Sequence, residues 1–195
     1  MAWLRLQAVA AVLALVAGAG VSHGFEFHEA TVEAIHLGFT NGSLTSAALV
    51  QFYLDQISRL NPLLRAVIEV NPDALLEARA ADARRRTSGG RLLGALDGIP
   101  VLLKDNMATR DKLNTTVGSL ALLGSVVRRD AGVVTRLRQA GAVVLGKANP
   151  TEWCNIRRVD NGWSARGGQT LVIKLALNFY YVMKINISHI GRFVF

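Results

Sequence analysis

Two short apolar runs constrain the fold of this chain most. Residues 99–103 (IPVLL) follow Gly98, and residues 142–146 (AVVLG) follow Gly141. Runs this short and apolar are typical of buried strands, because a surface helix would need polar positions at helical spacing. The run at residues 66–70 (AVIEV) predicts a third strand.

Helical patterns separate these strands. Residues 42–60 predict a helix with Ser43 or Thr45 as its N-cap, which Asn61 and Pro62 should end. The side chains at helical spacing that should face the core are Leu49, Phe52, Tyr53, Ile57 and Leu60.

Two further helices follow along the chain. Asn71, Pro72 and Asp73 should open one that runs to about Arg86. A later helix of about ten residues is expected to begin at a cap formed by Asp130 and to end at Gly141, in the C′ position. Helices that alternate with buried strands predict an α/β domain with a largely parallel sheet.

The basic residues do not indicate a nucleic-acid partner. The net charge is +8, but the cations are scattered among acids and apolar runs, and no basic stripe alternates with aromatic side chains. The densest cluster, Arg84–Arg86, is interpreted as the solvated C-terminal end of a helix.

The first 24 residues predict a secretory signal peptide. An apolar run of 14 residues, Ala8–Val21, follows a segment with one arginine and no acid. Cleavage is expected after Ala19 or Gly24, and the chain should then enter the secretory pathway, be secreted, and keep no stable membrane span. A retained anchor is the alternative, although the run is short for one.

Cysteine and histidine usage excludes several kinds of site. Cys154 is the only cysteine, so no internal disulfide is possible. The four histidines show no metal-ligand spacing, and the glycines of residues 89–94 lack the ending of a phosphate-binding loop. We therefore predict neither a metal nor a cofactor.

The composition changes after Thr170. In residues 171–195, 14 of 25 residues are Ile, Lys, Asn, Phe, Tyr or Met, against 23 in the first 170. Lys174, Lys184 and Arg192 interrupt any membrane span. We interpret this tail as unrelated to the preceding domain. It would come from a read-through intron, an alternative exon or an incorrect gene model. A contiguous exon that encodes the same tail in related chains would contradict this interpretation.

Lys104 is the candidate for chemistry, because it follows directly on a buried strand. One interpretation is structural: the aliphatic stem packs and the amine reaches water. The other is a desolvated, neutral amine that acts as a general base and deprotonates a serine hydroxyl.

The motifs around Lys104 resemble the amidase signature family. That family carries G-x-L-x-G-I-P-x-x-x-K-D-N, then T-T-x-G-S, then G-A-x-x-x-G-K-x-N-x-x-E. The matching residues here are Gly94, Leu96, Gly98, Ile99, Pro100, Lys104, Asp105, Asn106, Thr115, Thr116, Gly118, Ser119, Gly141, Ala142, Gly146, Lys147, Asn149 and Glu152. Residues 161–170 (NGWSARGGQT) are similar to the run before the family's serine-rich loop.

The resemblance implies an amidase that hydrolyses a small-molecule carboxylic amide through a Ser–cis-Ser–Lys triad without a cofactor. It implies a mixed sheet flanked by helices, with residues 25–170 as the N-terminal part of the domain, and it makes Lys104 the general base. The nucleophile and the cis-serine have no match. Ser188 lies in no glycine-rich loop, and Ser119 and Ser164 precede the loop and are expected to serve turns and caps.

Because both serines have no match, we expect the chain to be incomplete and inactive. It should fold poorly or aggregate, or it is no stable protein at all. The alternative function is a secreted, non-catalytic fragment that binds an amide ligand or a full-length amidase. A nitrilase-like trio of Glu152, Lys147 and Cys154 is a further possibility, although Cys154 is expected to pack as a small hydrophobic residue.

Overall fold

A three-stranded mixed sheet forms the centre of the molecule. The computed structural model describes residues 25–156 and 158–171. Strands β1 (Val67–Val70), β3 (Val143–Ala148) and β2 (Pro100–Lys104) lie side by side in that order. β3 pairs parallel with β2 and antiparallel with β1. All three predicted strands are confirmed, and the sheet is mixed, as the family resemblance implied.

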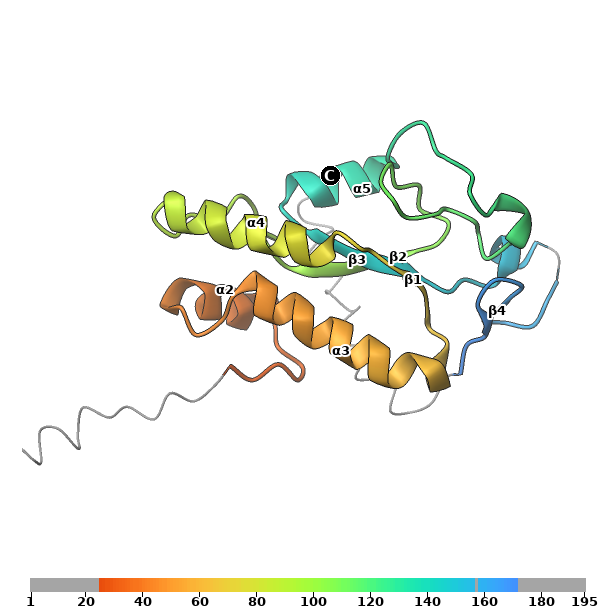
Figure 1. Ribbon diagram of the computed structural model, residues 1–195, viewed down its shortest axis with the longest axis horizontal. Helices are drawn as coiled ribbons and strands as arrows, with labels where there is room; N and C mark the ends of the chain where they lie inside the picture. Colours follow the sequence, from red (N-terminus) through yellow and green to blue (C-terminus); the bar gives the residue numbers. More distant parts are fainter. Residues whose placement is uncertain (1–24, 157, 172–195) are drawn as a thin grey trace, which may run out of the picture.

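Helices lie on both sides of this sheet. In Figure 1 the sheet lies between α3 (Ser46–Leu64) and α5 (Gly132–Gln139). Helix α4 (Ala74–Thr87) packs along α3 and contacts β3, and α2 (Val32–Asn41) precedes α3. The core consists of apolar side chains from helices and strands, among them Leu49, Val50, Tyr53, Ile57, Val101, Leu103, Val134, Val143 and Val144. The predicted α/β class is confirmed, but the predicted largely parallel sheet is wrong, because β1 pairs antiparallel with β3.

The first predicted helix, α3, begins and ends differently from the prediction. Thr45 is the N-cap, and its side chain accepts a hydrogen bond from the Ala48 amide. The predicted stop at Asn61 and Pro62 is wrong, because the helix continues to Leu64. Asn61 exchanges two 2.8 Å hydrogen bonds with the backbone of Val67, which ties the last turn of α3 to β1 and keeps it helical despite the proline.

The predicted cap of α5 is also wrong. The N-cap is Ala131, without a side-chain hydrogen bond. Asp130 instead accepts a hydrogen bond from the Arg110 amide and forms an ion pair with Arg138. Tertiary partners therefore take the carboxylate away from the helix end. Gly141 does lie just after the C-cap with a left-handed φ of 89°, as predicted.

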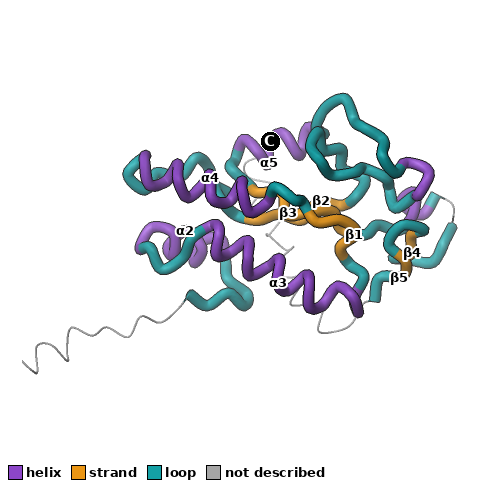
Figure 2. The backbone as a smooth tube through the Cα atoms, viewed as in Figure 1, coloured by secondary structure: helices purple, strands orange, loops and turns teal. Residues whose placement is uncertain are grey.

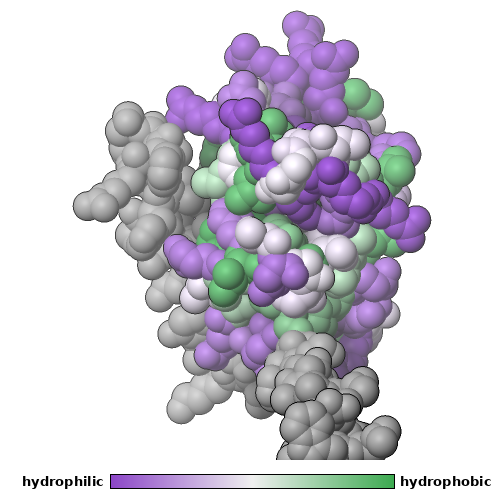
Figure 3. Space-filling view, turned by 90° about the vertical axis from the view of Figure 1, so that its left-hand side faces the viewer, coloured by the Kyte–Doolittle hydropathy of each residue, from purple (hydrophilic) through white to green (hydrophobic). Residues whose placement is uncertain are grey.

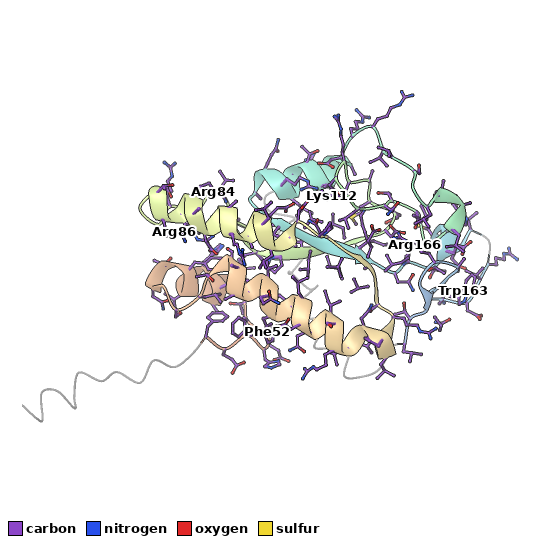
Figure 4. All side chains as sticks on the ribbon, viewed as in Figure 1. Phe52, Arg84, Arg86, Lys112, Trp163 and Arg166 are labelled. Carbon is purple, nitrogen blue, oxygen red and sulfur yellow. The ribbon has the colours of Figure 1, made fainter. Side chains whose placement is uncertain are left out.

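Arg84–Arg86 is not simply a solvated helix end. Arg85 is only 6% exposed; it pairs with Asp82 and Asp97 and donates to Ser46 Oγ at 2.7 Å. Arg84 also pairs with Asp97, whereas Arg86 is exposed (Figure 4). Viewed from this end of α4, the surface is hydrophilic with scattered hydrophobic residues (Figure 3). The interpretation failed at Arg85 because its acidic partners come from the helix itself and from a later loop.

Two short 3-10 helices and a two-stranded hairpin complete the described part. A long loop leaves β2 and reaches α5 (Figure 2), and it contains the short 3-10 helix η1 (Leu120–Leu122). After β3 come η2 (Glu152–Asn155) and a hairpin of β4 (Trp163–Ser164) and β5 (Gly168–Gln169).

No helix in residues 25–156 and 158–171 is long and apolar enough to span a bilayer. The predicted signal peptide, residues 1–24, lies outside the described residues, as does the predicted tail except for Leu171.

Candidate functional site

Lys104 is the last residue of β2. Its register partner on β3 is Ala148. Buried Val101 and Leu103 alternate along β2 with half-buried Leu102 and exposed Lys104, as expected when successive side chains point to opposite faces of a sheet. Within the described part of the chain, the Lys104 amine has neither a hydrogen bond nor an ion pair. Its side chain is thus held only through its backbone.

The backbone around Lys104 is fixed by two hydrogen bonds. The Met107 amide donates to the Lys104 carbonyl at 2.9 Å and closes a tight turn. The Asp105 amide donates to the Ala148 carbonyl at 3.1 Å and extends the pairing with β3. The direction in which Lys104 leaves the sheet is therefore set by the turn and the neighbouring strand.

Asp105 anchors the next part of the long loop. Its carboxylate is fully buried and accepts hydrogen bonds from the Thr116 amide (3.2 Å), the Thr116 hydroxyl and the Gly118 amide (3.0 Å). The Val117 amide also donates to the Asp105 carbonyl at 3.1 Å. Residues 116–118 are thereby wrapped around one carboxylate at the end of β2, where three donors stabilise its negative charge.

Gly118 cannot carry a side chain in this arrangement. Its φ of +77° is left-handed, and a Cβ would lie 2.5 Å from the Cβ of Ser164. The glycine of the T-T-x-G-S motif thus permits close contact between the loop and the β4–β5 hairpin.

Arg166 joins this hairpin to the sheet. Its guanidinium pairs with Glu69 on β1 and lies 3.8 Å from the Asp105 carboxylate. Burial alone would raise the pKa of Glu69, but hydrogen bonds from Arg166 and Asn114 outweigh this and lower it. The motif at residues 161–170 contains Arg166, but the sequence pattern alone predicts no role for this residue.

Comparison with known proteins identifies the family. The Amidase family model matches residues 48–167, more than half of the chain. The chain belongs to the amidase family.

Amidases of several organisms are similar to this chain. A probable amidase of Arabidopsis thaliana is 56% identical over 151 residues, which is 76% of this chain and 30% of that protein. A putative amidase of Schizosaccharomyces pombe is 46% identical, over 73% of this chain and 24% of its own length. The native peptide amidase of Stenotrophomonas maltophilia superposes with a TM-score of 0.68 at 51% identity, over 75% of this chain and 30% of that one. The chain thus spans 30% or less of the length of these amidases.

Ser119 and Ser164 serve local structure, as predicted. Ser119 caps η1 and accepts a hydrogen bond from the Ala121 amide at 3.4 Å. Ser164 is buried; its hydroxyl donates to Asn149 Oδ1 at 2.6 Å and accepts from the Gly167 amide at 2.8 Å. Neither hydroxyl bonds to Lys104. Lys104 therefore has no serine partner among residues 25–156 and 158–171.

The nitrilase-like trio is not assembled. The Glu152 carboxylate accepts from the Ala165 amide at 2.7 Å, and the Lys147 amine donates to Met107 and Thr115. The predicted packing of Cys154 is wrong, because this thiol is exposed and accepts from Asn106 Nδ2 at 3.3 Å. Left-handed φ values occur at Trp153, Cys154 and Asn155, so the backbone departs here from a regular helix.

No group of three or more histidine, cysteine or acidic side chains that could hold a metal ion occurs in the described ranges. His23 and His189 lie outside these ranges.

Lys147 is 0% exposed, although the sequence pattern predicted no role for it in the amidase site. A lysine directly after the apolar run of residues 142–146 was the available signal.

Proposed function

We propose that this chain carries the lysine-bearing part of an amidase active site, with Lys104 as general base. The observation that carries the proposal is the exposed amine at the end of β2, without a bonding partner in the described part of the chain, on a backbone fixed by the Asp105 loop. The amine is open to a partner group, and it can act as a general base only where that partner also removes it from water, because burial favours the neutral form of an amine.

The reaction is hydrolysis of a small-molecule carboxylic amide. A serine oxygen attacks the carbonyl carbon, the C–N bond breaks, and an acyl-enzyme forms that water then hydrolyses. The family resemblance implies that a second serine passes the proton to the lysine and that backbone N–H groups stabilise the oxyanion. The motif order from Gly94 to Glu152 and the 51% identity to a peptide amidase support this reaction class.

The polypeptide of these 195 residues is proposed to be inactive on its own. Its sequence contains no glycine-rich serine loop, and the described serines Ser119 and Ser164 are held by local hydrogen bonds. Loss of any triad member removes most of the rate even when the other members remain.

A serine-reactive fluorophosphonate probe tests this proposal. We expect no more labelling of the purified chain than of a Lys104→Ala variant, while the peptide amidase of Stenotrophomonas maltophilia, tested in parallel, is labelled. Strong labelling of the wild-type chain that Lys104→Ala abolishes would show a competent serine beside this lysine and would overturn the proposed inactivity.

A second candidate is a non-catalytic fragment that binds an amide ligand or a full-length amidase. It is favoured by β2, which is an edge strand of the described sheet and so offers unpaired backbone groups. This function requires a cooperative thermal melt and co-purification with an intact amidase; a chain that melts without cooperativity and is recovered alone excludes it.

We further propose that the chain is exported through the secretory pathway after cleavage of residues 1–24. The support is the apolar run Ala8–Val21. N-terminal sequencing of protein recovered from the culture medium tests export and cleavage together: an intact Met1, or protein retained in cells, would contradict it.

A further inference from the structure

The most unusual charged group in the described part is the Lys147 ammonium. Lys147 lies on the central strand β3, between its register partners Glu69 on β1 and Leu103 on β2, and it is 0% exposed. Burying a charged group is costly unless hydrogen bonds and opposite charges compensate it. A lysine in this position therefore calls for partners that use its charge.

These partners come from both ends of one loop segment. The Lys147 amine donates to the Met107 carbonyl at 2.6 Å and to the Thr115 hydroxyl at 3.1 Å. Met107 is the residue whose amide closes the turn onto the Lys104 carbonyl. One ammonium group thus holds the turn after β2 and the segment that returns toward Asp105.

Burial and the surrounding charges act on Lys147 in opposite directions, and burial has the larger effect on its pKa. Burial lowers the pKa of the Lys147 ammonium, and the carboxylates of Asp105, Asp111 and Glu69 oppose that shift. Arg166, which lies near two of these carboxylates, acts in the same direction as burial. The cluster of Lys147, Asp105, Glu69 and Arg166 therefore balances two cations against two anions.

Lys147 and Lys104 take different places on the sheet. Lys147 pairs with Leu103, and the neighbouring pair is Lys104 with Ala148. Since side chains alternate along a strand, Lys147 and Lys104 belong to opposite faces, so Lys147 acts on the Lys104 turn through the backbone of Met107.

We propose that Lys147 is a positioning residue, which fixes the turn from Lys104 to Met107 and so the direction in which the Lys104 amine leaves β2. This inference rests on the proposed role of Lys104 as general base. It assigns to the lysine of the G-K-x-N segment a task distinct from that of Lys104: Lys147 holds the backbone, and Lys104 takes part in the proposed reaction.

Amide hydrogen exchange on the Lys147→Met variant tests the proposal. Methionine fills a similar volume without the ammonium group. We expect the Met107 amide to exchange roughly tenfold faster or more, as loss of a charge-assisted hydrogen bond predicts. The Val144 amide in the centre of β3 should be unchanged. Lys112→Met is the matched control, because Lys112 lies in the same loop but pairs with Asp73 at an exposed position.

An unchanged Met107 amide, or equal acceleration at Met107 and Val144 in a folded variant, would overturn the positioning role. If the Lys147→Met variant does not fold, a nuclear magnetic resonance measurement on the wild-type chain tests the positioning role instead. Its Lys147 Nζ should give a slowly exchanging ¹⁵N signal with nuclear Overhauser contacts to Met107 and Thr115, and an absent or rapidly exchanging signal overturns the proposal. These measurements do not depend on the fluorophosphonate result, so failure of this inference and failure of the proposed function are distinguishable.

Discussion

Replacement of Arg85 by alanine should strongly destabilise the fold. Arg85 is buried and joins three segments: its guanidinium pairs with Asp82 of α4 and Asp97 of the loop before β2, and donates to Ser46 at the start of α3. The variant would leave the buried Asp82 carboxylate without its cation and would leave Asp97 with Arg84 alone, which costs about 3–5 kcal/mol. Small domains have a total stability of about 5–15 kcal/mol, so this loss is a large fraction.

Chemical denaturation followed by circular dichroism measures this change. Arg86→Ala is the matched control, because it removes the same side chain from the next position of α4, where it is exposed. We expect the control to shift the free energy of unfolding by less than about 0.5 kcal/mol. Equal effects of the two variants would show that the Arg85 ion pairs contribute nothing beyond ordinary helix content.

Part of the fold could be predicted because its signals are local. The strands at residues 66–70, 99–103 and 142–146 are short apolar runs between turn residues, and each forms a strand in the structure. Thr45 and Gly141 act at helix ends through their own side chain or backbone conformation. Such features depend on few neighbours, which is why sequence reasoning finds them.

The errors occurred where distant partners decide. Asp130 is a residue type that often caps a helix, but the Arg110 amide and the Arg138 side chain bind its carboxylate. Arg85 lies in a run of arginines that is typical of a solvated helix end. Asp97, twelve residues later in the sequence, nevertheless pairs with its guanidinium in the interior. Neither pairing can be read from spacing, because each depends on how the loops fold back on the sheet.

The candidate site was predicted in the same partial way. The motif located Lys104 and Asp105, and the strand before them located the end of the sheet. The motif did not predict that its two lysines have opposite environments. Lys104 is exposed, whereas Lys147 is fully buried. Whether a lysine on a strand is buried depends on which carbonyl and hydroxyl groups reach it, and here these come from Met107 and Thr115.

The Asp105→Asn substitution should be the most damaging single change at the candidate site. The carboxylate oxygens of Asp105 receive three donors, from the Thr116 amide, the Thr116 hydroxyl and the Gly118 amide. An asparagine side chain replaces one acceptor oxygen by an NH₂ group, so at least one donor would face another donor. The charge that compensates Lys147 is also lost. We expect the free energy of unfolding to fall by about 3–5 kcal/mol, the cost of leaving a buried charge without its partner.

Asp73→Asn is the control for this prediction. The Asp73 carboxylate pairs with the Lys112 amine at 2.8 Å, but 66% of the Lys112 side chain and 32% of the Asp73 side chain are exposed. Solvent screens such a pair, and its loss should cost about 0–1 kcal/mol. If Asp105→Asn folds with a similarly small loss, and the amides of Thr116 and Gly118 remain protected from exchange, then the carboxylate does not organise the loop. In that case the turn that holds Lys104 must be stabilised mainly by Lys147 and by the pairing of β2 with β3.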